Sequence, residues 1–299
     1  MAAFSIPAEA AGVDLQTAYM AVSSRRLMSY AAALQATEDV YLNDLSPKGI
    51  VGLPAFIVTP EWLVMNGQSY RQALAADDAR MWRCIHVQQD SRFLQPLVPG
   101  IELAIRGRIQ VLRQTRIGVY VAVRLDTERT DTGEAMAESW FCGIFLGDRL
   151  DGADRVLQEP PALTGTAHSG PWQNVPTPIL DISRTLPHLY TEAAAIWNPI
   201  HTERSAARDA GLQDTLLHGS CTWGTAGLYL IRYLAGGDPR RLKRLGARMV
   251  GKASVGASLF LRYRYLEQCG ESGARRVNFE VFDNADVLVL AGGVAEIAA

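Results

Sequence analysis

The chain has 299 residues, of which 48% are hydrophobic and 20% are charged, so it can bury a sizeable core, and fibrous and disordered classes are excluded. Its 29 basic and 31 acidic side chains leave a net charge of −2, which gives no overall field to attract nucleic acid or anionic lipid. At roughly 150 residues per domain, this length predicts about two domains.

The cysteines and the N-terminus indicate a protein of the reducing cytoplasm. The cysteines form no Cys-x-x-Cys pair, so the sequence spells out neither a zinc site nor a dithiol redox site; they are Cys84, Cys142, Cys221 and Cys269. Residues 1–16 lack the basic flank and apolar run of a signal peptide, and no stretch of about 18 apolar residues occurs. We expect a cytoplasmic protein with no metal site and no membrane contact.

The first half of the chain changes from a helical pattern to a strand pattern. Apolar residues at helical spacing predict a helix over 17–36 and a second over about 60–76. Period-two runs of β-branched and aromatic residues then predict four strands, near 86–88, 101–112, 118–126 and 138–146. We interpret residues 1–150 as one antiparallel domain.

A stretch rich in Pro, Gly, Asp and Thr at 151–178 is typical of a linker. After it the same order of elements recurs over residues 179–299, with a polar loop, an apolar helix and four strands; these are expected at 197–217, about 219–235, 247–254, 256–267, 275–282 and 286–297. Two units in which a sheet buries one face on a helix make an α+β fold. The helix at 219–235 has almost no charge, so it should be covered nearly all round.

The segment from Ala195 to Thr202 is the most informative for chemistry. Asn198-Pro199 predicts a tight turn that can hold His201 at one angle. A neutral imidazole can accept a proton near pH 7, because its ordinary pKa is about 6.5. His218-Gly219 follows 17 residues after His201 and opens the apolar helix, whose free N–H groups can bind negative charge on a carbonyl oxygen.

These residues carry a resemblance to a known family. The segments Ile196-Trp197-Asn198-Pro199-Ile200-His201 and Leu217-His218-Gly219-Ser220-Cys221-Thr222 resemble the motif of the MaoC-like, R-specific enoyl-CoA hydratase and 3-hydroxyacyl dehydratase family. The first half, from Tyr30 to Glu61 and on through its strands, is similar to the degenerate N-terminal unit of two-domain members.

The resemblance implies a double hot-dog fold and a substrate carried as an acyl thioester on coenzyme A or acyl carrier protein. It implies addition or removal of water at the 2,3 bond, with no metal or organic cofactor. In that scheme His201 is the base or acid, Asn198 supports it, and Gly219 supplies an oxyanion N–H. The two fused units supply what single-domain members obtain by dimerising, and a homodimer remains a further expectation.

The sequence departs from this family at one decisive position. Ile196 stands where the family has its catalytic Asp, and Ala195 where it has Gly. Isoleucine transfers no proton, and losing one member of an acid–base pair costs on the order of 10²–10⁴ in rate. Replacement acids that the sequence offers are Glu192, Glu203 and Asp39.

Three functions therefore stay open. The first is an atypical dehydratase or hydratase that uses His201 alone. The second is a non-hydrating cyclase or double-bond isomerase acting on a polyketide- or fatty-acid-like chain. The third is an inactive protein that binds acyl thioesters.

Further residues are candidates for substrate binding. Trp197 could form a wall of the acyl pocket or fix the loop, while His218 and Ser220 lie at the helix start. A basic run between Pro239 and Leu266 contains Arg241 and Arg244, which could bind the phosphates of coenzyme A or form a solvated face. No nucleic-acid recognition motif accompanies it.

Overall fold

The computed structural model describes residues 4–163, 169–266 and 273–299. The first half of the chain holds a group of short helices followed by four long strands. In chain order its elements are β1 (Ser5–Pro7), η1 (Ala8–Ala10), β2 (Ala18–Ala21), α1 (Ser24–Ala33), α2 (Asp39–Leu42), η2 (Pro54–Ile57), α3 (Val58–Met65), α4 (Gln68–Ala73), α5 (Asp78–Met81), β3 (Cys84–Phe93), β4 (Glu102–Gln114), β5 (Gly118–Arg129) and β6 (Ala135–Leu146).

The second half is built around one long helix. Three short strands come first in this part of the chain: β7 (Arg149–Asp151), β8 (Arg155–Val156) and β9 (Ser169–Asn174). Its further elements are β10 (Leu180–Asp181), α6 (Leu186–Ala194), η3 (Pro199–His201), α7 (Arg204–Asp209), α8 (Gly219–Leu234), η4 (Pro239–Arg241), β11 (Leu242–Met249), β12 (Ser258–Tyr265), β13 (Arg275–Asp283) and β14 (Leu288–Ile297).

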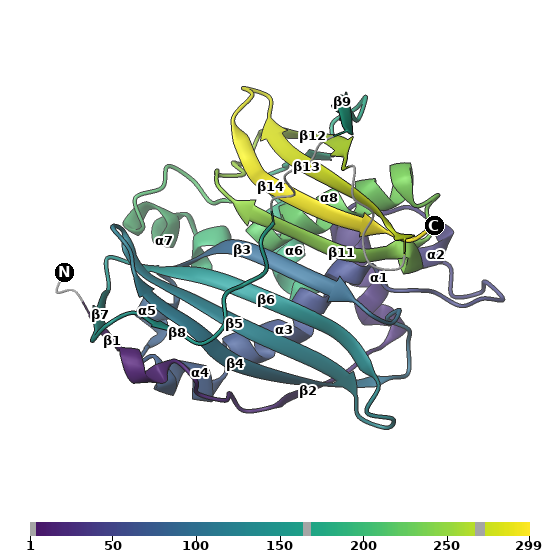
Figure 1. Ribbon diagram of the computed structural model, residues 1–299. Coiled ribbons are helices and arrows are strands. Elements are labelled where there is room, and N and C mark those ends of the chain that lie inside the picture. The colour runs from purple at the N-terminus through teal and green to yellow at the C-terminus, as the bar shows by residue number, and fades with distance from the viewer. Residues whose placement is uncertain (1–3, 164–168, 267–272) are drawn as a thin grey trace.

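One antiparallel sheet runs through both halves. Its described strands lie in the order β10-β12-β13-β14-β11-β3-β6-β5-β4-β2, and β11 pairs with β3 where the halves meet. Helices α1, α3, α6 and α8 lie against one face of this sheet (Figure 1). The arrangement is α+β, with two sheet-and-helix units side by side, which confirms the expected double hot-dog.

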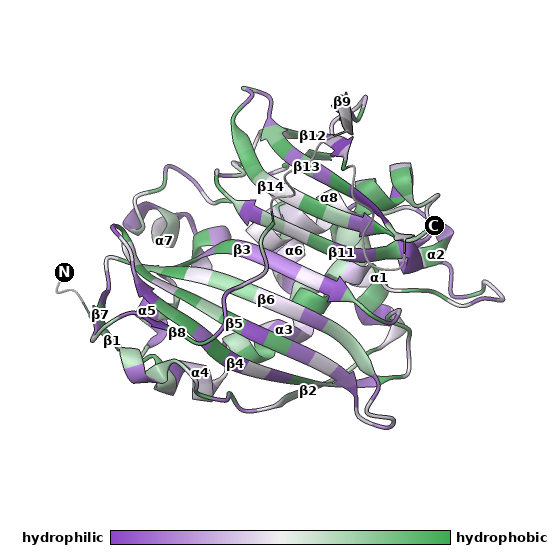
Figure 2. Cartoon of the chain, viewed as in Figure 1, coloured by the Kyte–Doolittle hydropathy of each residue, from purple (hydrophilic) through white to green (hydrophobic). Residues whose placement is uncertain are grey.

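The periodicity of the sequence accounts for these elements. Hydrophobic and hydrophilic residues alternate along many of the strands (Figure 2), and buried positions alternate with partly exposed ones along β12. In α8 every residue from Ser220 to Leu228 is buried, so this helix is covered nearly all round, as expected. With 16 residues it is the longest helix of the described chain, and no described helix is long and apolar enough to span a bilayer.

Two predicted helices and one predicted strand are wrong in their bounds. The segment 17–36 contains β2 before α1, because Ser23 caps α1 by accepting from the backbone N–H of Arg26 at 3.3 Å. The segment 60–76 is broken into α3 and α4 at Gly67, where a Cβ would lie 2.9 Å from the Leu63 carbonyl oxygen. Strand β11 starts at Leu242 rather than 247, since the basic side chains there hide its alternation.

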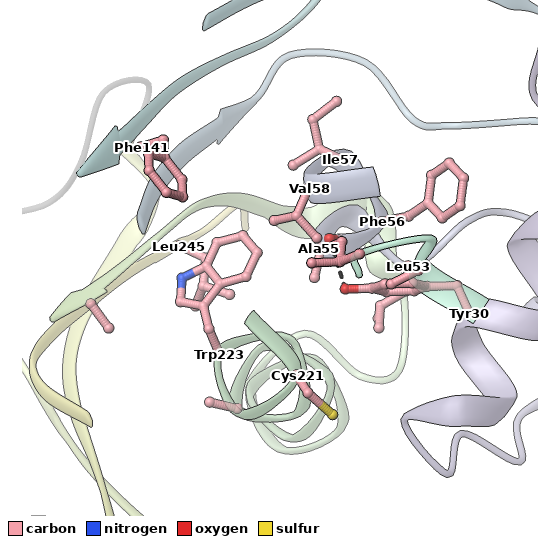
Figure 3. Packing of buried hydrophobic residues seen from close by; sticks show 14 of the residues in the cluster. Tyr30, Leu53, Ala55, Phe56, Ile57, Val58, Phe141, Cys221, Trp223 and Leu245 are labelled. Atoms are coloured by element: carbon pink, nitrogen blue, oxygen red, sulfur yellow. Dashed lines mark hydrogen bonds between the residues drawn. The ribbon is translucent and has the colours of Figure 1, made fainter. Parts of the chain in front are cut away.

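Both halves contribute to one hydrophobic core. Tyr30 of α1 donates to the Ala55 carbonyl at 2.9 Å, and Trp223 of α8 points toward the η2 and α3 segment (Figure 3). Gly224 lets α8 approach closely, because a Cβ there would lie 2.8 Å from the side chain of Leu34 and 3.3 Å from Ala55. The second helix therefore packs directly on the first half.

The expected linker packs along the sheet. Strand β8 pairs with β4 and β9 pairs with β12, while Leu163 is buried between them. Figure 1 shows this segment crossing the sheet face opposite the helices. Because one sheet joins both halves, the boundaries at 150 and 179 stay predictions. Residues 164–168, Cys269 and the end of the strand expected at 256–267 lie outside the described residues; the other three cysteines are free thiols.

Candidate active site

The motif segment folds into the predicted turn. Helix α6 ends at Ala194, the next residue Ala195 takes a left-handed conformation with φ +53°, and the chain then reverses. The Asn198 Oδ1 accepts from the backbone N–H of Ile200 at 3.2 Å, and Pro199 opens the single turn η3 that ends on His201. Ile196 is buried, so the position at which the resemblance led us to expect Asp is part of the hydrophobic core.

His201 is oriented by one backbone group. Its Nδ1 lies 2.8 Å from the Leu216 carbonyl oxygen. A carbonyl only accepts, so we assign the proton to Nδ1, which leaves Nε2 as an acceptor without a hydrogen-bond partner among the described residues. The ring stacks on His218 with centroids 3.7 Å apart and an interplanar angle of 26°.

His218 is held from the other side by α6 and the motif. Its Nε2 lies 3.1 Å from the Ile196 carbonyl oxygen and 3.3 Å from the Thr191 Oγ1. The Tyr190 ring lies 5.0 Å away, centroid to centroid. The side chain is buried, and its Nδ1 has no partner among the described residues. His218 is therefore fixed in position and packs against one face of the His201 ring.

Burial keeps both imidazoles neutral. Desolvation lowers the pKa of His201 from 6.5 to about 4, against a smaller raising effect of the Leu216 carbonyl. The pKa of His218 is lowered still further, first by desolvation and then by the neighbouring His201. No described carboxylate hydrogen-bonds to either ring, so only the weaker hydrogen bonds to the Leu216 and Ile196 carbonyls oppose the desolvation.

The start of α8 presents free backbone donors beside these rings. His218 precedes the helix in an extended conformation and makes no side-chain cap, and the N–H groups of Gly219 and Ser220 find no acceptor in the described part of the chain. A Cβ on Gly219 would lie 2.9 Å from the side chain of Met249, so a glycine fits tightly there. These donors can stabilise an oxyanion.

A chain of hydroxyl groups adjoins the helix start. The Tyr190 OH donates to the Ser220 Oγ at 3.0 Å, and the Tyr30 OH lies 3.5 Å from the Tyr190 OH. Sequence analysis missed Tyr190, Thr191 and Tyr30. The available signal was the position of the first two, eight and seven residues before Asn198, which is about two helical turns.

The three replacement acids do not reach the histidines. Glu192 is exposed and accepts from the Trp197 Nε1 at 3.3 Å, while Glu203 is exposed at the start of α7. Asp39 accepts from the Asn43 Nδ2 at 3.3 Å. Each therefore lacks a hydrogen bond to either imidazole.

The two arginines that were expected to bind phosphate form hydrogen bonds to other groups of the protein. Arg241 donates to the Ala298 and Ala235 carbonyls at 3.0 and 3.1 Å, which caps the end of the second unit. Arg244 is buried and donates twice to Asp90 of β3, at 2.9 and 2.7 Å. Arg244 therefore joins β11 to β3 and is not at the surface that phosphates would meet.

A cavity of about 200 Å³ adjoins the motif from the first half. Trp197 and Asn198 form one wall, and α3 to α5 supply the rest; the lining residues are Trp62, Asn66, Arg71, Asp78, Met81, Trp82, Trp197 and Asn198. His201 and Gly219 lie outside this lining. Among the described residues, no group of three or more His, Cys, Asp or Glu is placed to hold a metal ion.

Fold and site together define a double hot-dog protein with an Asn-Pro-Ile-His turn before its second helix. Residues 175–278 match the family described as MaoC like domain, and residues 9–139 match the FAS1-like, dehydratase domain region. The second half is thus similar to MaoC-like dehydratase domains and the first half to the FAS1-like dehydratase region.

Two curated relatives are similar to this chain at less than 30% sequence identity. A probable enoyl-CoA hydratase 2 of Dictyostelium discoideum is 23% identical over 178 residues, covering 58% of each chain. The peroxisomal multifunctional enzyme type 2 of Mus musculus is 27% identical over 239 residues, covering 79% of this chain and 31% of that one. The chain therefore spans 58% of the length of the first relative and 31% of the length of the second.

Solved structures agree with the fold. A MaoC-like dehydratase from Phytophthora capsici has a TM-score of 0.75 at 16% identity and covers 97% of both chains. A Mycobacterium tuberculosis protein described as a double hotdog fold has a TM-score of 0.63 at 12% identity, with 96% of this chain and 95% of that chain covered.

Proposed function

We propose that this chain is a hydro-lyase that removes water from, or adds it to, the 2,3 position of an acyl thioester carried on coenzyme A or an acyl carrier protein. The observation that carries the proposal is the oriented, neutral imidazole of His201 near the uncapped start of α8. The matching family domains and the named enoyl-CoA hydratase relative support the same class.

One imidazole suffices for a syn elimination. The Nε2 of His201 takes the proton from C2 of a 3-hydroxyacyl thioester, and the Gly219 N–H stabilises the negative charge on the thioester oxygen. The resulting imidazolium then gives that proton to the 3-hydroxyl group, which leaves as water while the double bond forms. Hydration is the reverse sequence, so no second acid is required.

The low pKa of His201 sets the limits of this chemistry. With a pKa of about 4 the ring is fully neutral at pH 7, so the acceptor form is always present. It is a weaker base than an imidazole with an ordinary pKa, and its conjugate acid is a stronger proton donor. We therefore expect slow proton abstraction and easy departure of water.

The test is the removal of the imidazole. We expect His201→Ala to lower water loss from a 3-hydroxyacyl thioester by about 10²–10⁴-fold. His188→Ala removes an exposed histidine on α6 and should leave turnover unchanged, which makes it the matched control. Equal turnover in the His201 variant and the wild type would exclude the proposed base.

A double-bond isomerase is the second candidate, because no described carboxylate bonds to the imidazoles and isomerisation needs only one base. It gives a product of unchanged mass and no oxygen exchange with ¹⁸O-labelled water, whereas the hydro-lyase incorporates the label. Binding of thioesters without either product would indicate the non-catalytic alternative. Cytoplasmic location and a homodimer remain predictions.

A further inference from the structure

We propose that the cavity beside Asn198 binds a planar, aromatic group on the acyl chain of the substrate. This inference rests on the proposed thioester site, because it takes the cavity as the part of that site that receives the acyl chain. Three observations support it: the indoles that line the cavity, the pairing of its charges, and its position next to the motif.

Three indole rings line the cavity, alongside four polar or charged residues. Trp62 of α3, Trp82 at the end of α5 and Trp197 of the motif all line it, so half of the six tryptophans of the chain gather there. Trp82 is 45% exposed and Trp197 is 56% exposed, although large aromatic side chains are more often buried. Aromatic rings favour offset or edge-to-face contacts with other rings.

The charges at the cavity are already paired. The Arg71 Nη1 lies 2.5 Å from the Asp78 Oδ1, and its Nη2 donates to the Asn66 Oδ1 at 2.6 Å. The Nε of the same guanidinium donates to the Asn66 carbonyl oxygen at 3.1 Å. With its main donors occupied and its charge balanced by Asp78, Arg71 offers little to a phosphate, and the cavity favours a neutral group.

Size and position fit one ring on a short acyl chain. A volume of about 150 Å³ is enough for benzene, so a cavity of about 200 Å³ has the volume for a ring with a small substituent. Asn198 lies one 3₁₀ turn before His201, a rise of about 6 Å. An acyl chain starts at the thioester carbonyl, whereas the adenine of coenzyme A lies at the far end of the pantetheine arm, so an acyl ring is favoured over adenine.

The experiment compares two substrates that carry no adenine: the N-acetylcysteamine thioesters of 3-hydroxy-3-phenylpropanoate and 3-hydroxyhexanoate. We expect Trp82→Ala and Trp197→Ala each to lower kcat/KM for the aryl substrate by about three- to tenfold more than for the alkyl one. Trp172→Ala, which removes an indole on β9 that packs on Arg262 and Arg264, is the control. An equal loss for both substrates would overturn the inference.

Binding separates this inference from the proposed reaction. A 3-phenylpropyl thioether of N-acetylcysteamine cannot react, and its affinity is measured by calorimetry on the wild type and the same variants. Weaker binding to the Trp82 and Trp197 variants supports the cavity even if no turnover is found. Turnover without any aryl preference removes the inference alone. Displacement of the thioether by adenosine 3′,5′-bisphosphate would assign the cavity to adenine and contradict an acyl ring.

Discussion

The helices of the two hot-dog units differ most in how they begin. Helix α8 starts abruptly after an extended His218 and runs for 16 residues. Helix α3 continues from the 3₁₀ turn η2 through a helical Ile57, so its first N–H groups are already inside a helix, and it ends after 8 residues. Free donors are thus found at α8, whereas the early end of α3 leaves room for the cavity at Asn66. The second unit therefore provides the backbone donors for the proposed reaction, and the first unit provides most of the cavity for the acyl chain.

The strongest test of this comparison concerns how the units are joined. Arg244 and Asp90 are both buried, so Arg244→Met leaves a buried carboxylate without its main partner and should lower the free energy of unfolding by about 3–5 kcal/mol. Arg106→Met breaks an exposed, solvent-screened pair with Glu128 and should lower the free energy of unfolding far less. Urea denaturation measures both. Similar losses would show that the join between β11 and β3 contributes no more than a surface pair.

A smaller effect is expected where α8 packs on the first half. A Cβ at Gly224 would crowd Leu34, Tyr30 and Ala55, so Gly224→Ala should destabilise the fold by about 1–3 kcal/mol. A Cβ at Gly227 would lie within 3.4 Å of one side-chain atom only, on Leu245 at 2.7 Å, and the gain in helix propensity of about 1 kcal/mol should partly offset that contact, so Gly227→Ala should destabilise the fold less. Thermal unfolding compares the two, and the reverse order would contradict direct packing between the units.

The pH dependence of turnover tests whether the second unit keeps the His201 imidazole neutral. His201 must be neutral to accept a proton, and its pKa is lowered from 6.5 to about 4. We expect kcat/KM to be flat above about pH 5 and to fall about tenfold per unit below pH 4. An apparent pKa of 6–7 would contradict a desolvated imidazole without a carboxylate.

The same shift affects stability. Between pH 6.5 and 4 the unfolded chain binds protons on His201 that the folded chain does not, so the free energy of unfolding falls as the pH falls. Denaturation measured at each pH therefore serves as the control that separates loss of structure from loss of the base.

The smallest effect on stability is expected at Ala195, the residue just before the segment Ile196 to His201. Ala195 has φ +53°, a conformation that costs an L-residue about 1–2 kcal/mol and a glycine almost nothing. Ala195→Gly should therefore raise the free energy of unfolding by about 0.5–1 kcal/mol, after the higher entropy of the unfolded chain is subtracted. Ala193→Gly within α6 should have the opposite sign. Destabilisation by both would mean that Ala195 is not strained.

Local pattern was enough to predict the four strands of the first half, α8 and the Asn198 turn, because period and turn chemistry are encoded within a few residues. Contacts between distant segments were not predictable in this way. The basic run indicated a phosphate surface, yet Arg244 pairs with Asp90, 154 residues away. Likewise, Tyr190 is recognisable as a neighbour of the helix start only once α6 is placed beside α8.

The ladder between β3 and β11 has a consequence for any attempt to produce the halves separately. Its partners are far apart in the chain, so their pairing must await synthesis of most of the protein and involves a costly loop closure. A fragment ending near residue 150 would present β3 as an open edge of unpaired N–H and C=O groups, a template for aggregation. Co-expression of both pieces should keep the first half out of inclusion bodies better than expression of that half alone.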